Sequence, residues 1–182
     1  MLGWSAQCRL PMAAMLNLPR LVGVDTNVAL DFASGDEDVC DAIATIQARI
    51  AGVELLLPPT VMGELANAAV ASQDRNVRMA ATKMLRQHRD LGFRVVSFIP
   101  LGFDQVDHIA ERLRHQGLLS EEEVHDSVII VEAAALGCAL LTSSDAELAG
   151  VDHEKLTVEL SRFDLTAPVI ATPREIVKKF FR

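Results

Sequence analysis

Short apolar runs alternate with longer amphipathic stretches along most of the chain. The runs are leucine- or valine-rich and stop at polar, glycine or proline residues, as buried strands of a parallel sheet do. The predicted strands are Leu21 to Val24, Val53 to Leu57, Arg94 to Ile99, Cys138 to Thr142 and Leu156 to Leu160, with a weaker apolar segment at Val169 to Ala171.

The stretches between these runs carry apolar residues at spacings of three and four, which is typical of amphipathic helices. Thr26 or Asn27 is expected to cap a short first helix, and Ser120 with Glu123 has the form of a capping box before another. The other predicted helices are Asp36 to Gly52, Thr60 to Ala71, Asp74 to Asp90, Phe103 to Gln116, the helix that is capped at Ser120 and ends at Gly137, and one that starts at Pro173 or Arg174.

Strand and helix alternate with connections long enough for crossovers, which favours a central, mainly parallel sheet with helices on both faces. We therefore predict a three-layer α/β/α sandwich. With 182 residues the chain is most simply one domain. Residues 1–19 are interpreted as an N-terminal tail and residues 20–182 as the domain, because Arg9 and Pro11 interrupt the early apolar groups and no secretory signal fits.

Composition limits the classes of function that this protein can have. The formal charge of −8 gives no general attraction to nucleic acid or to an anionic membrane, so any polyanion must be met locally. No apolar tract reaches the roughly 20 residues of a membrane span. Cys8, Cys40 and Cys138 lack metal-site spacing and suit unpaired thiols in a reducing cytoplasm.

Four acids stand far apart in the chain, each beside an apolar run or on a helix that follows one: Asp25, Glu64, Asp126 and Asp145. Acids at the carboxyl ends of parallel strands point into the crevice where open α/β sheets bind ligands. Carboxylates gathered there repel one another unless a cation lies between them, and oxygen ligands without His or Cys select Mg²⁺ or Mn²⁺. The pattern predicts a metal-dependent site that cleaves phosphodiester bonds.

Each acid also has a simpler interpretation. Asp25 and Asp145 suit helix caps, and Glu64 and Asp126 suit solvated helical positions. Glu122 and Glu123 are possible additional acids on the face of Asp126, or a solvated first helical turn. None of the five histidines is interpreted as catalytic, and His125 is expected to point away from the acids.

Four motifs together resemble the PIN domain family. They are Val24-Asp25-Thr26-Asn27, Pro59 to Ala66 around Glu64, His125-Asp126-Ser127-Val128-Ile129 and Leu141-Thr142-Ser143-Ser144-Asp145. The resemblance implies a metal-dependent ribonuclease, with many small members being VapC-type toxins of type II toxin-antitoxin pairs. It implies an acidic catalytic and metal site of Asp25, Glu64, Asp126 and Asp145, with Asn27 and one or more of the Thr142, Ser143 and Ser144 hydroxyls near the substrate phosphate.

The resemblance also implies a cognate antitoxin and a homodimer as partners. A cationic helical stretch offers possible RNA contacts at Arg75, Arg78, Lys83, Arg86 and Arg89, although an ordinary solvated face explains it equally. Two other functions stay open: a PIN-like module that binds RNA or protein without cutting, and a metal-dependent phosphatase on a related fold.

Overall fold

The computed structural model describes residues 20–180, so the predicted tail at residues 1–19 lies outside the described part. The strands are β1 (Arg20–Val24), β2 (Val53–Leu57), β3 (Phe93–Val95), β4 (Leu140–Thr142) and β5 (Val169–Ala171). The helices are α2 (Thr26–Ser34), α3 (Glu37–Arg49), α4 (Pro59–Ala71), α5 (Arg75–Gln87), α6 (Phe103–His115), α7 (Val124–Ala135), α8 (Ala146–Ala149), α9 (His153–Ser161) and α10 (Pro173–Phe180).

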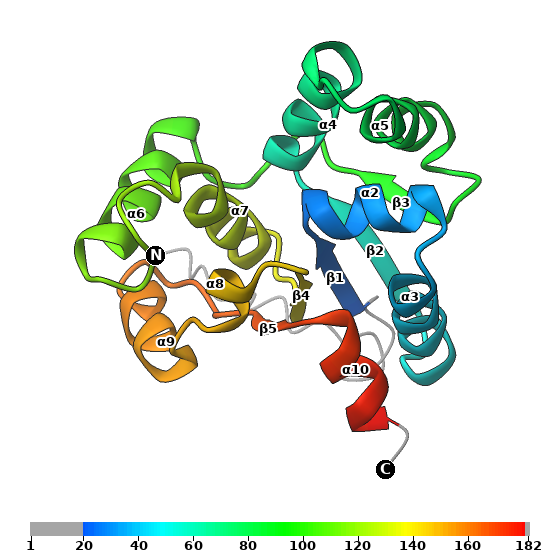
Figure 1. Ribbon diagram of the computed structural model, residues 1–182. Coiled ribbons are helices and arrows are strands. Elements are labelled where there is room, and N and C mark those ends of the chain that lie inside the picture. The colour runs from blue at the N-terminus through cyan, green and yellow to red at the C-terminus, as the bar shows by residue number, and fades with distance from the viewer. Residues whose placement is uncertain (1–19, 181–182) are drawn as a thin grey trace, which may run out of the picture.

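The five strands between residues 20 and 180 form one parallel sheet in the order β3-β2-β1-β4-β5. In Figure 1, α2, α3 and α5 lie on one side of the sheet and α6, α7 and α9 on the other. The predicted three-layer α/β/α sandwich is therefore confirmed.

The strand order predicts a crevice at the carboxyl ends of the strands. From β1 the chain moves outward through β2 to β3, and it returns to the other side of β1 for β4 and β5. Parallel strands end at the same edge, and neighbouring strands whose connections leave in opposite directions open a ligand crevice there. Here that point lies between β1 and β4, where Val24 pairs with Thr142.

Helix α7 packs closely on the sheet because β1 carries a glycine. A Cβ added to Gly23 would lie 3.2 Å from Leu141 Cδ1 and 3.4 Å from the Cβ of Ala133 on α7. Ile129, Ile130 and Val131 of α7 are fully buried. Since α7 leads into β4, its first turn, which contains Asp126, comes to the crevice edge.

Some predicted elements are wrong. Residues 156–160 form part of helix α9, because the Asp152 side chain caps the helix and Leu156 and Leu160, four residues apart, bury one helical face. The predicted strand at 94–99 is cut to Phe93–Val95: the Val96 N–H still bonds the Leu57 carbonyl, but Phe98 is exposed.

Two predicted caps are also wrong. The Asp25 side chain, not Thr26 or Asn27, caps α2. Ser120 and Glu123 form a turn in which the Glu123 N–H donates to the Ser120 backbone carbonyl, so no capping box exists. Helix α7 consequently begins at Val124, and Asp126 belongs to its first turn.

No helix between residues 20 and 180 combines the length and the apolarity that crossing a membrane requires.

Candidate functional site

Asp25 is a buried acid at the carboxyl end of β1. Its Oδ1 accepts from the Thr26 N–H at 2.6 Å, and its Oδ2 accepts from the Ser143 hydroxyl at 2.8 Å. The residue is 2% exposed, and burial raises the pKa of the Asp25 carboxyl from 3.8 to about 6, against the lowering effect of those two hydrogen bonds. Capping alone does not require such burial, because the caps Asp74 and Asp152 are exposed.

The loop after β4 brings Ser143 and Asp145 beside Asp25. The Ser143 hydroxyl donates to Asp25 and accepts from the Asp145 N–H at 3.0 Å. Asp145 caps α8 through its Oδ1, and its charge contributes to the raised pKa of Asp25. Of the three candidate hydroxyls, only that of Ser143 contacts Asp25 and Asp145. The Thr142 hydroxyl lies 3.5 Å from the Gly23 carbonyl, and exposed Ser144 turns toward Asp31.

Glu64 lies on α4 and is held from two other helices. Its Oε2 accepts from the Thr26 hydroxyl of α2, and its Oε1 lies 2.6 Å from His125 Nδ1 at the start of α7. The prediction that His125 points away is therefore wrong. Because α7 begins at Val124, His125 belongs to the first turn, which faces α4 across the crevice. The His-Asp dipeptide was the sequence signal that could have identified it.

Asp126, another of the four predicted acids, lies in the first turn of α7, which faces α4 across the crevice. Burial, a hydrogen bond with Glu123 and the charges of Asp25, Glu123 and Asp145 raise the pKa of the Asp126 carboxyl from 3.8 to about 7. Glu123 is thus close to Asp126, whereas Glu122 is exposed to solvent.

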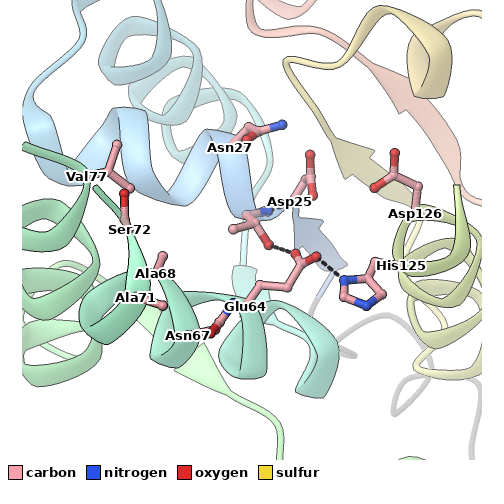
Figure 2. Close-up of a pocket in the computed structure, with 11 residues that line it drawn as sticks. Asp25, Asn27, Glu64, Asn67, Ala68, Ala71, Ser72, Val77, His125 and Asp126 are labelled. Carbon is pink, nitrogen blue, oxygen red and sulfur yellow. Dashed lines mark hydrogen bonds and ion pairs between the residues drawn. The ribbon is translucent and has the colours of Figure 1, made fainter. Parts of the chain in front are cut away.

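Asp25, Glu64, His125 and Asp126 line one open cleft of about 440 Å³, whereas Ser143 and Asp145 lie behind Asp25 and are not among its lining residues. Figure 2 shows Asp25, Glu64 and Asp126, from three different elements, around the same space, with His125 beside Glu64. Asn27 also lines the cleft and is exposed, and Asn67 and Ser72 line its far side together with Ala68, Ala71 and Val77. The cleft therefore has an acidic end and a neutral end.

Glu132, a buried acid that sequence reasoning missed, joins helix α7 to helix α4. Glu132 of α7 is 2% exposed, and its carboxylate accepts from the Thr60 N–H at 3.1 Å and from the Thr60 hydroxyl at 2.9 Å. Thr60 lies in the first turn of α4, whose N–H groups have no intrahelical partners. Glu132 therefore caps α4 from a neighbouring helix.

Replacing Glu132 by alanine should lower the free energy of unfolding by about 1–3 kcal/mol, because it leaves the Thr60 N–H without its acceptor. Glu132→Gln should cost less, since the amide oxygen still accepts. Chemical denaturation measures the effect, with Glu111→Ala on the exposed face of α6 as the matched control. Equal stability of the Glu132→Ala protein and the control protein would contradict the role of this cap.

The candidate RNA-contact cations of α5 divide into two sets. The Arg78 guanidinium donates to the Ser72 and Gln73 carbonyls after α4, and Lys83 Nζ donates to the Ala33 carbonyl at 2.8 Å. Arg78 and Lys83 therefore donate to carbonyls at the C-terminal ends of α4 and α2, respectively. Arg75, Arg86 and Arg89 are exposed.

The acids suit a divalent cation in charge and chemistry. None of the ion pairs formed within residues 20–180 involves Asp25, Asp126 or Asp145, so the raised pKa values have no cationic partner to lower them. The donors are hard carboxylate oxygens, which Mg²⁺ and Mn²⁺ prefer. In the described region no three His, Cys, Asp or Glu side chains stand close enough to enclose one ion by themselves. The acids thus supply suitable oxygen donors beside one cleft without forming a closed cage for an ion.

Comparison with family models decides the classification. The PIN domain model matches residues 22–154, which include all four acids. The chain belongs to the PIN domain family. A search of curated proteins finds no match.

This PIN domain is also similar to a solved structure described as VapBC2 from Rickettsia felis bound to a DNA fragment from their promoter. The TM-score is 0.56 at 10% sequence identity, and the match covers 84% of this chain and 98% of the other. At that identity the similarity concerns the fold. It extends over most of the PIN domain described above.

Proposed function

We propose that this PIN domain is a metal-dependent endoribonuclease of the VapC type, the toxin of a type II toxin-antitoxin pair. The observation that carries the proposal is Asp25, a buried carboxylate without a cationic partner in the described region, which shares a cleft with Glu64 and Asp126. Holding such charges together costs stability that a divalent ion would return. A protein that only binds RNA or another protein would gain nothing from this loss of stability.

In this proposal Asp25 and Asp126 are the main ligands of Mg²⁺ or Mn²⁺, with Glu64 and Asp145 completing the site. The bound ion supplies the charge that activates water and stabilises the phosphate oxygens. Ser143, which is fully buried, orients the Asp25 carboxylate through its 2.8 Å hydrogen bond and acts on the substrate through that acid. Exposed Asn27 contributes an amide to the same phosphate from the rim of the cleft.

The partners follow from the same assignment. A VapC-type toxin is neutralised by an antitoxin, and the solved neighbour is itself a VapBC2 complex. The acidic balance of this chain suits a basic antitoxin segment. We further propose a homodimer in the cytoplasm, where the free thiols of Cys40 and Cys138 remain reduced.

The purified protein should cleave RNA with Mg²⁺ or Mn²⁺ and lose all cleavage with a chelator, because no Lys or Arg of the described residues lines the cleft to stabilise the charge on the phosphate. Single-stranded RNA incubated with the metal, with the chelator, and with the metal restored measures this. A chromogenic phosphate monoester serves as the control substrate and should stay intact.

Mn²⁺ stabilisation without any RNA cleavage would favour a silent RNA- or protein-binding module. Hydrolysis of the monoester at a rate equal to that of RNA would favour a phosphatase.

A further inference from the structure

His125 of α7 is joined to Glu64 of α4 by a short hydrogen bond. Its Nδ1 lies 2.6 Å from Glu64 Oε1; the imidazole side chain is 67% exposed and the carboxylate side chain is 26% exposed. The other oxygen of the same carboxylate accepts from the Thr26 hydroxyl. Both oxygens of Glu64 are thus held, one from α7 and one from α2, while Glu64 itself stands on α4 (Figure 2).

We propose that His125 is a positioning residue of the site: its Nδ1–H holds the Glu64 carboxylate in the orientation in which it completes the acid group. This inference rests on the proposed nuclease function. A free glutamate side chain loses rotamer entropy when it is fixed. Two donors that fix Glu64 before the ion arrives remove that cost from metal binding.

The contact between His125 and Glu64 connects to the other acids through Thr26. The Thr26 hydroxyl donates to Glu64, and the N–H of the same residue donates to Asp25. Asp25 in turn accepts from the Ser143 hydroxyl, which accepts from the Asp145 N–H. An isolated exposed ion pair contributes little to stability and orients no third group.

The position of His125 in the chain adds a second effect. It immediately precedes Asp126, so its bond to α4 also fixes the first turn of α7, which carries the acid on the opposite wall. One imidazole therefore sets two of the four carboxylates relative to each other. Partners that orient metal ligands in this way typically account for a 10- to 100-fold effect on metal affinity or activity.

The two ring nitrogens allow a sharp test. Asparagine places an amide N–H near the position of Nδ1, and glutamine places one near the position of Nε2. His125→Gln should weaken Mn²⁺ binding and lower kcat by about 10- to 100-fold, whereas His125→Asn should restore most of both. Thr26→Val and Thr26→Ser should form the equivalent pair on the other oxygen. His153→Gln, at an exposed position at the start of α9, is the control.

The measurements are Mn²⁺ affinity by calorimetry, kcat and KM for RNA cleavage, and thermal unfolding, all on the full-length chain. In a Glu64→Ala background His125→Gln should have no further effect, because both substitutions remove the same interaction. This cycle separates positioning through Glu64 from every other role of the ring.

Three results would overturn the inference while leaving the nuclease function intact. The first is a His125→Gln protein with wild-type Mn²⁺ affinity and kcat. The second is rescue by glutamine but not by asparagine, which would indicate an RNA contact through Nε2. The third is a full effect of His125→Gln in the Glu64→Ala background. A wild-type protein that neither binds Mn²⁺ nor cuts RNA would instead refute the proposed function, and the inference with it.

Discussion

Asp25→Asn should abolish RNA cleavage and leave the fold intact. The neutral amide cannot balance a divalent ion, and the charge stabilisation that is lost amounts to several kcal/mol, so kcat should fall by about a thousandfold or more. The amide oxygen can still accept from the Thr26 N–H, and the amide N–H can donate to Ser143 in place of the present bond. Single-turnover cleavage of RNA with saturating Mn²⁺ measures the loss.

Asp152→Asn is the matched control for this experiment. Asp152 caps α9 as Asp25 caps α2, but it is exposed and lines no part of the cleft. The control protein should cleave RNA at the wild-type rate. If Asp25→Asn cut RNA as fast as the control, the metal-dependent mechanism would be excluded. A denatured Asp25→Asn protein would be detected by circular dichroism.

Stabilisation by Mn²⁺ should be strong near pH 8 and absent near pH 5, by up to about 2.7 kcal/mol at a hundredfold excess over Kd. In the folded protein the pKa is about 6 for Asp25 and about 7 for Asp126, both above the ordinary 3.8. The folded state therefore holds these protons more tightly than the unfolded chain does. Without metal, their contribution to stability is present below about pH 4 and is lost as the pH rises through 6 and 7. In the proposed site Mn²⁺ binds the ionised carboxylates, so we expect it to compete with the protons over that range.

Thermal unfolding with Mn²⁺ and with a chelator, at several pH values, measures this competition. Asp25→Asn should remove part of the pH dependence of the metal-free protein and most of the Mn²⁺ effect. An Mn²⁺ shift that stays constant from pH 5 to pH 8 would mean that the ion binds elsewhere.

The sequence predicted the three layers of the fold and the location of the site at the carboxyl ends of the strands, because both depend on local patterns. Apolar runs ending at Asp25 and at Thr142 identify two strands whose neighbours must be helices, and parallel connection then places their ends together. The choice among the three hydroxyls after β4 needed the structure. Only the backbone path of that loop determines that Ser143 turns inward and Ser144 turns outward.

The errors also have physical causes. A five-residue run such as Leu156 to Leu160 fits either period, and the cap at Asp152 decided for a helix. The contacts of Glu132 with Thr60 and of His125 with Glu64 join residues 72 and 61 positions apart. No local pattern specifies such pairs, because they depend on how α4 and α7 cross.

The two ties between α4 and α7 have a mechanical consequence. Buried Glu132 joins Thr60 in the first turn of α4, and exposed His125 joins Glu64 one turn later. Two contacts one turn apart on α4 restrict how far the two helices can separate. For the proposed ribonuclease we expect this rigidity to favour unpaired RNA, whose backbone can bend to bring one phosphate to the acids, over a stiff duplex.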